Sequence, residues 1–471
     1  MPNKSIIKFI YLRLKVSWGK CPIRINKFTC LILIIYFSPF TVFASKLFGR
    51  VTLGAVVIKE QYKTNDFGSD SNDSLFSSNR LFLKGTELFN DQWSSVLDAR
   101  NTYDQFGKLN KEQLRLEAKN TFHFRQLSFG NIESRSQFRT NLGRFSLNEA
   151  GGVYVDGLQL DCSKCVSVLN SGIFTGYNPK SPEKTELEFN DKATQVGGYI
   201  TYKSSESNWD TYSYISHAFV QQKYFEQIER KYLFQQINYQ WDEFSRWNST
   251  VFLDFYSQNW PSSKIQTMSL FYQQEFSSQL DMELNYIKID ALEYQRKQSV
   301  LENLPSSPFS ESGIQINLRQ STGTVYSLSY SKGLRELDQL SLETYKLGLE
   351  LTGILNSSID LRLFAGAKNN FTSADTFIRG NVGYFSKNWE ITLDQTIEQA
   401  KYKDTSETSN QYITELGATS FFGKTVFVTT SFQRASDNKV DILSLFFKLG
   451  YRFGFAETAP IRDGSAPRGA L

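Results

Sequence analysis

His123 and His217 are the residues of this chain whose type is most often used in catalysis, and they are its two histidines. Nucleophilic catalysis would need a serine or an acid next to them on the same face of a strand. Neither His123-Phe-Arg nor His217-Ala-Phe supplies a serine at that spacing. The chain also has no P-loop, no His-Glu-x-x-His motif and no glycine-rich dinucleotide turn after a strand. We therefore expect no catalytic residue, no metal site, no cofactor and no enzyme activity.

The second candidate for chemistry is the pair Cys162 and Cys165 in Asp-Cys-Ser-Lys-Cys-Val. Val166 stands where a haem-attachment motif has histidine, and no second cysteine pair exists to complete a zinc site. A βαβ pattern, which thioredoxin chemistry requires, is not found around the pair. In an exported protein this spacing indicates a small disulfide, and we predict that Cys162 and Cys165 form one.

The N-terminal segment predicts export. Residues 28–43 form an apolar run of about 16 residues, which is too short for a stable membrane helix. Seven basic residues and no acidic one precede this run, and Val42-Phe43-Ala44 follows it as a cleavage site. We predict a signal peptide at residues 1–44 that is cleaved between Ala44 and Ser45; the alternative is an uncleaved anchor. Without the leader, 45 of the 52 Lys and Arg remain, against 48 Asp and Glu. This slightly acidic charge balance gives no reason to expect nucleic-acid binding.

The remaining chain alternates apolar and polar residues in segments of about ten, which is the period of a β-strand with one apolar face. Clear examples lie at residues 279–290, 341–351, 357–366 and 440–455. In the last of these, every second residue is apolar: Leu443, Leu445, Phe447, Leu449, Tyr451, Phe453 and Phe455. No convincing amphipathic helix of more than a few turns accompanies these segments.

Aromatic residues distinguish a membrane barrel from a soluble β-sandwich. Phe, Tyr and Trp make up 15% of the chain, and many lie at the ends of the predicted strands. Aromatic rings at both ends of an apolar band are typical of strands that cross a bilayer. Closing the sheet also satisfies every backbone N–H inside the hydrocarbon. We predict an all-β protein: a transmembrane antiparallel β-barrel at residues 45–455, with a disordered tail at residues 456–471.

Short and long connections alternate along the predicted strands, as in outer-membrane barrels. Short ones are predicted near residues 90–92, 205–207, 242–245, 277–278, 321–322 and 387–388, and longer ones at 63–78, 104–112, 220–229, 291–312, 332–340 and 400–409. Treating residues 161–193 as one long loop gives about 22 strands, in a range of about 16 to 24. We expect this loop either to narrow the barrel or to lie outside it as a surface loop.

Two segments resemble Gram-negative outer-membrane proteins. The strand from Leu443 to Phe455 is similar to the terminal strand that the barrel-assembly machinery reads, although residues 456–471 follow it here. Residues 142–160, with a Gly143-Arg144 step and an Asp156-Gly157 step, resemble a porin segment near the pore lining. The resemblance implies an outer-membrane location, contact with outer-membrane lipid and insertion by that machinery.

Alternation also predicts which charged residues face the interior of the barrel. Basic and acidic residues are nearly balanced among them, which predicts weak selectivity. The predicted pore-lining residues are Asp98, Arg100, Arg115, Glu117, Asp281, Glu283, Arg319, Lys346, Glu350, Asp360, Arg362, Arg379, Glu390, Asp394, Glu415, Lys448 and Arg452.

These features favour a porin-like channel for passive diffusion of small hydrophilic solutes across the outer membrane of a Gram-negative bacterium. No globular plug precedes the first predicted strand at residues 48–62. The alternative is a barrel scaffold that encloses or presents a partner, such as a surface lipoprotein or a redox protein. A homo-oligomer is compatible with either hypothesis.

Overall fold

The computed structural model describes most of the chain between Ala44 and Gly454. The described residues are 44–63, 71–88, 93–105, 119–131, 136–166, 168–179, 193–204, 212–225, 227–242, 245–255, 263–290, 308–320, 323–354 and 358–454. The predicted signal peptide up to residue 43, the predicted tail at 456–471, and Arg115 and Glu117 lie outside these residues.

Twenty-two antiparallel strands form one sheet. The first eleven are β1 (Ala44–Tyr62), β2 (Ser71–Leu88), β3 (Trp93–Gln105), β4 (Lys119–Gly130), β5 (Phe138–Leu147), β6 (Val153–Val166), β7 (Leu169–Tyr177), β8 (Ala193–Lys203), β9 (Tyr212–Tyr224), β10 (Gln227–Gln240) and β11 (Arg246–Phe255). A short 3-10 turn, η2 (Asn148–Ala150), joins β5 to β6. The others are β12 (Ser263–Ser277), β13 (Leu280–Ile289), β14 (Phe309–Arg319), β15 (Thr324–Arg335), β16 (Leu340–Gly353), β17 (Ile359–Asn369), β18 (Ser373–Phe385), β19 (Trp389–Tyr402), β20 (Thr408–Phe422), β21 (Val426–Ser436) and β22 (Val440–Phe453).

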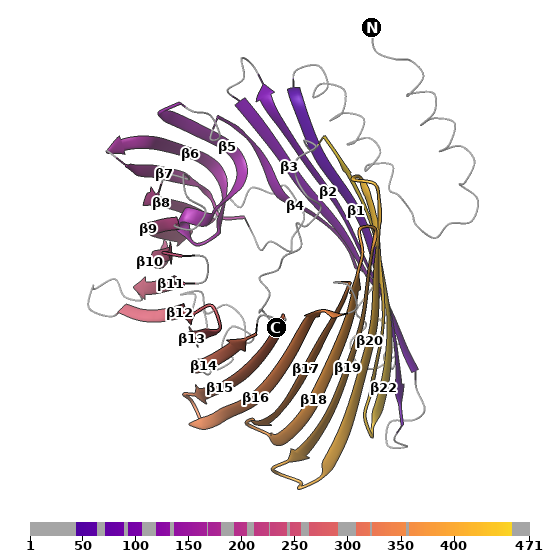
Figure 1. Cartoon of the computed structure of the whole chain (residues 1–471). Helices are drawn as coiled ribbons and strands as arrows, with labels where there is room; N and C mark the ends of the chain where they lie inside the picture. Colours follow the sequence, from indigo (N-terminus) through magenta and orange to yellow (C-terminus); the bar gives the residue numbers. More distant parts are fainter. Residues whose placement is uncertain are drawn as a thin grey trace, which may run out of the picture.

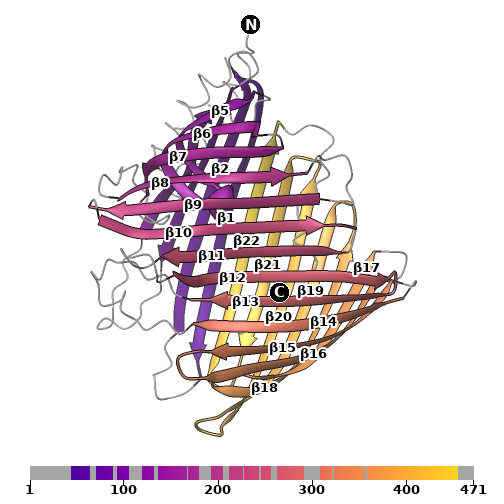
Figure 2. The ribbon, with the colours of Figure 1, turned by 90° about the vertical axis from the view of Figure 1, so that its left-hand side faces the viewer.

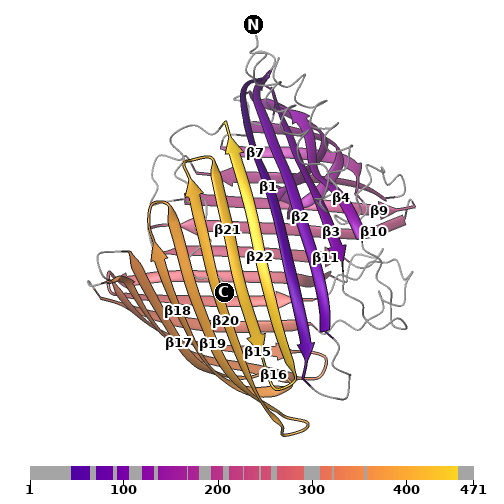
Figure 3. The ribbon, with the colours of Figure 1, turned by 90° about the vertical axis from the view of Figure 1, so that its right-hand side faces the viewer.

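The sheet closes on itself because β1 pairs with both β2 and β22. The closing ladder runs from Gly49 opposite Phe453 to Tyr62 opposite Val440. In Figures 2 and 3 the strands of the near and far walls cross, as expected when strands tilt from the barrel axis. The prediction of an antiparallel β-barrel of about 22 strands is confirmed.

The outer face of the barrel is apolar where it meets lipid. Leu347 and Ile378 each keep 61% of their surface exposed, while their neighbours in the chain face inward. Exposed aromatic side chains gather near the shorter connections: Tyr239, Trp247, Tyr384, Trp389 and Tyr451. Such a belt suits the interface between hydrocarbon and water. No helix among the described residues has the length and apolar character needed to cross a bilayer.

The prediction that residues 161–193 form one connection is wrong. β6 continues to Val166, and β7 occupies residues 169–177 within that range. β7 was missed because glycine, serine and threonine interrupt its alternation. With β7 present, the connection at 178–192 falls on the same side of the barrel as the other long connections. The total of 22 strands therefore agrees with the prediction, but the path of the chain between β3 and β8 differs from the predicted one.

Several connections predicted to be long are shorter in the structure. β2 begins at Ser71, and only residues 225–226 separate β9 from β10. Likewise, residues 336–339 join β15 to β16, and residues 403–407 join β19 to β20. At several of these ends, such as Ser71–Ser74 of β2 and Thr408–Gln411 of β20, both faces of the strand are polar, so the alternating pattern ends before the strand does. The alternation of apolar and polar residues in the sequence therefore predicts the part of each strand that lies in lipid, and not the full length of the strand.

Candidate functional site in the barrel lumen

The end of the β5–β6 hairpin, residues 145–155 around η2, turns from the barrel wall into the lumen (Figure 1), while Asp156–Cys162 of β6 stay paired with β7 in the wall. β4 and β5 pair only from Leu127 opposite Arg144 to Gly130 opposite Asn141, whereas β5 and β6 pair along the full length of β5. Gly143 lies at the separation point with φ of 112°, and a side chain there would collide with the Leu127 carbonyl. The sequence thus permits β5 to bend away from β4 at this glycine.

Apolar packing holds the end of the hairpin against the inner face of the strands that follow β6 in the sheet, β7–β10. Phe145, Leu147, Ala150 and Val155 are each at most 2% exposed. Their neighbours come from β7 to β10: Phe174, Tyr199, Ala218, Val220, Tyr232 and Phe234. Burial of a side chain such as Phe or Leu contributes about 1.5–3 kcal/mol. The hairpin is therefore a fixed part of the lumen.

Polar contacts fix the position of the hairpin tip. The Ser216 hydroxyl donates to the Glu149 carbonyl at 2.7 Å, and the Tyr232 hydroxyl donates to the Ala150 carbonyl at 3.3 Å. The Gln195 amide donates to the Tyr154 carbonyl. These bonds satisfy backbone carbonyls that would otherwise lose water on burial.

An ion pair marks the place where the hairpin separates from β4. Arg144 Nε and Nη2 donate to the two carboxylate oxygens of Asp156 at 2.6 and 2.5 Å. Arg144 Nη1 also donates to the Phe124 carbonyl of β4 at 3.0 Å. Both side chains are nearly buried, so removing either would leave an uncompensated charge. Arg144 and Asp156 belong to the Gly143-Arg144 and Asp156-Gly157 steps of the segment that resembles porins.

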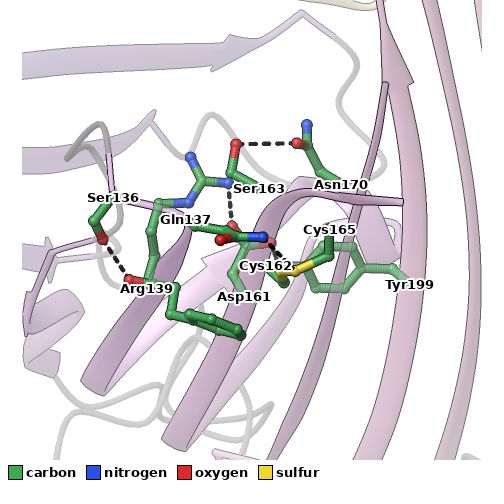
Figure 4. The surroundings of a disulfide bond; sticks show 10 residues. Ser136, Gln137, Arg139, Asp161, Cys162, Ser163, Cys165, Asn170 and Tyr199 are labelled. Carbon is green, nitrogen blue, oxygen red and sulfur yellow. Dashed lines mark hydrogen bonds and ion pairs between the residues drawn. A yellow bond between two sulfur atoms is a disulfide. The ribbon is translucent and has the colours of Figure 1, made fainter. Parts of the chain in front are cut away.

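Cys162 and Cys165 form a disulfide with Cα atoms 5.6 Å apart. The bond spans a register shift between Cys162 and Val166, on the side of the short connections. Figure 4 shows it beside Asp161, which pairs with Arg139 and accepts from the Tyr199 hydroxyl at 3.0 Å. The disulfide therefore lies at the β6–β7 turn and not at the base of a long loop.

The described residues predicted to line a pore share one face of the sheet, opposite the face that carries the exposed apolar side chains. Several form ion pairs there: Arg319 with Asp281 at 2.8 Å, Arg379 with Asp394 at 2.9 Å, and Arg362 with Glu350 at 3.7 Å. The candidates on this face are Asp98, Arg100, Asp281, Glu283, Arg319, Lys346, Glu350, Asp360, Arg362, Arg379, Glu390, Asp394, Glu415, Lys448 and Arg452.

Sequence reasoning missed the inward hairpin. Two signals could have found it: the Gly151-Gly152 turn, and apolar residues such as Phe145 and Val155 at positions that face the lumen. The histidines lie apart, with His123 opposite Arg100 on the inner face and His217 exposed on the outer face. Within the described residues, no three His, Cys, Asp or Glu side chains gather as a metal site would require.

Comparison with solved structures gives the fold. The chain is similar to the translocation pore of the P pilus usher PapC, with a TM-score of 0.51 and 7% identity over 87% of this chain and 100% of that one. It also aligns with OccAB4 of Acinetobacter baumannii (TM-score 0.43, 10% identity, 88% and 100% covered) and with OccK7 (OpdD) of Pseudomonas aeruginosa (0.43, 7%, 87% and 99%). No family model matches the chain, and no curated protein matches its sequence.

The closed sheet and its apolar belt define a β-barrel of the Gram-negative outer membrane. Within that class, this chain is a 22-stranded barrel that carries a hairpin from its own wall inside its lumen.

Proposed function

We propose that the protein is a porin-like channel for passive diffusion of small hydrophilic solutes, and that the β5–β6 hairpin is its constriction. The observation that carries the proposal is the docking of residues 145–155 on the inner face of β7–β10. A barrel of this many strands encloses a wide lumen unless something narrows it. The hairpin does so with buried apolar contacts, while charged side chains on β12–β22 keep the rest of the lumen hydrated.

The fixed position of the hairpin favours a static constriction over a mobile gate. Its tip combines an apolar cluster with hydrogen bonds from Ser216 and Tyr232, and its base carries the Arg144–Asp156 pair. We therefore expect a steady current that depends on the size of the ion and only weakly on voltage.

The test is to replace residues 146–154 by Asn-Gly, which closes a two-residue turn between Phe145 and Val155. The purified protein is inserted in planar bilayers, and single-channel conductance is compared with that of the unchanged chain. A marked rise is expected, because the hairpin no longer reaches the tip contacts on β8–β10. As a control, residues 404–406 between β19 and β20 are replaced in the same way.

An unchanged conductance in a correctly folded variant would show that the hairpin does not limit the current. A folded barrel that never conducts would contradict the channel itself. Silence together with a stoichiometric co-purified protein would favour the alternative of a barrel scaffold around a partner.

A further inference from the structure

Five basic side chains gather on one part of the lumen wall, on β22, β1, β2 and β3. We call this group the basic wall: Lys448, Arg452, Arg50, Arg80 and Arg100. The strand register brings them into three adjacent cross-strand rows. Arg50 lies directly opposite Arg452, and Arg80 lies directly opposite Arg100. Thr52, two residues beyond Arg50, faces Arg80, so the two pairs are diagonal neighbours.

Carboxylates balance only part of this charge. Asp98 is the one acidic residue in the three rows, and Arg80 donates to both of its oxygens at 2.7 Å. Arg100 donates instead to the Ser78 hydroxyl at 2.9 Å. Lys448 lies opposite Gly54, and Gly54 lies opposite Ser78, the residue that accepts from Arg100. Within the described residues of these three rows, basic side chains therefore outnumber acidic ones.

An aromatic ring separates two of the cations. The Phe427 ring of β21 lies opposite Gly450, between the positions of Lys448 and Arg452 along β22. Lys448 Nζ is 5.7 Å and Arg452 Cζ is 5.5 Å from the ring centre. Cation–π contacts of this kind hold a cation in place without neutralising it. The two groups are thus positioned side by side and stay available to an anion.

Acidic residues concentrate on a different part of the wall. The inner faces of β18–β20 carry one basic residue, Arg379, which pairs with Asp394, and five acidic ones: Asp375, Glu390, Asp394, Glu398 and Glu415. The described inner face of β21 between the two regions has no charged residue. Among the described residues of β18–β22 and β1–β3, acidic and basic side chains are therefore separated around the circumference of the lumen. Like charges directly opposite each other on neighbouring strands are destabilising, so the basic wall is an arrangement that an anion would stabilise.

We propose that the basic wall is a binding surface for oxyanions, namely solutes with a carboxylate or phosphate group, on their way through the lumen. Guanidinium groups match the geometry of such groups and donate two parallel hydrogen bonds to them. The inference rests on the proposed channel function, because it names the class of solute that the channel favours. Figure 1 shows β22, β1 and β2 across the barrel interior from β8–β10, on which the hairpin docks.

The test uses inorganic phosphate and the double variant Lys448→Gln with Arg452→Gln. The matched control is Lys346→Gln with Arg362→Gln, which removes the same two residue types from the lumen and also separates a lysine from a phenylalanine ring. Two readouts are measured against chloride at equal ionic strength: block of the chloride current, and the temperature at which the folded barrel in detergent unfolds. The second readout does not depend on conduction.

Phosphate is expected to block the current and raise the unfolding temperature of the unchanged protein. Its apparent affinity should fall about tenfold in the first double variant, as expected for two water-exposed ionic contacts. It should change little in the control. Equal losses in both variants, or no phosphate effect on a conducting protein, would overturn the proposal. A barrel that conducts no current but is still stabilised by phosphate through Lys448 and Arg452 would contradict the proposed channel function and support the proposed oxyanion-binding surface.

Discussion

Two adjacent glycines at the hairpin tip allow the docking of the hairpin to be measured. Gly151 and Gly152 have φ of 80° and 76°, so alanine at either position costs about 1–2 kcal/mol of backbone strain. A Cβ at Gly151 would lie 2.6 Å from the Phe252 ring and 3.0 Å from Phe234. A Cβ at Gly152 would meet nothing within 4 Å. Gly152→Ala is therefore a control that carries the strain without the collision.

The collision gives the expected difference between the two variants. Inserting a methyl group into a well-packed core costs about 1–3 kcal/mol. That cost acts on the docked hairpin and leaves the wall ladders intact. The open population of the hairpin should therefore be about 5- to 150-fold larger in Gly151→Ala than in Gly152→Ala.

A cysteine under the hairpin reports this population. Ser216 is fully buried beneath Glu149, and Cys162 and Cys165 are bonded to each other. Both alanine variants are made in a Ser216→Cys background, and the rate of labelling by a water-soluble maleimide is measured. Labelling should be faster with Gly151→Ala than with Gly152→Ala. Equal rates, with both barrels folded in a heat-shift gel, would show that the tip is not packed on Phe252 and Phe234.

Three further outcomes are expected. Leu349→Arg should abolish folding in lipid, at a cost of about 2–4 kcal/mol near mid-membrane, while Lys346→Ala should fold normally because its side chain faces the lumen; equal heat-modifiability would reverse the face assignment. The Asp338 carboxylate in the β15–β16 turn accepts from Arg335 Nε at 2.9 Å, which lowers the pKa of Asp338. The stability that this contact contributes should be fully present above the ordinary aspartate pKa and should be lost as the pH falls through the lowered pKa. Carbon NMR of Asp338 measures this pKa, and an ordinary value would contradict the reasoning. N-terminal sequencing of the extracted protein should begin at Ser45, and a start inside residues 1–44 would rule out cleavage there.

The fold could be predicted because one pattern, the alternation of apolar and polar residues, runs along most of the sequence of a membrane barrel. Lipid requires an apolar side chain at every second position, and the sequences of β13, β16 and β22 follow that alternation. β7 and the hairpin depart from this pattern, because apolar residues of both face the lumen. Phe174 of β7 and Phe145 of β5 are apolar residues that face inward, where both belong to one buried cluster inside the lumen. Alternation alone assigns such residues to lipid or to a loop.

The charged lumen shows a second limit of sequence reasoning. Alternation assigns Lys448 and Arg452 to the inner face, but it does not tell which residues of β1 lie beside them. That depends on register, and register comes from turns and from the whole closed sheet. Counting inward charges gives a balanced lining, whereas the register joins Arg452 to Arg50 and Arg80 to Arg100. A solute within a few ångströms of the wall experiences the local group and not the total, because water and salt screen more distant charges. The selectivity of such a lumen is therefore a property of its strand register, and a variant that shifts charge between neighbouring rows should alter it without changing the net charge.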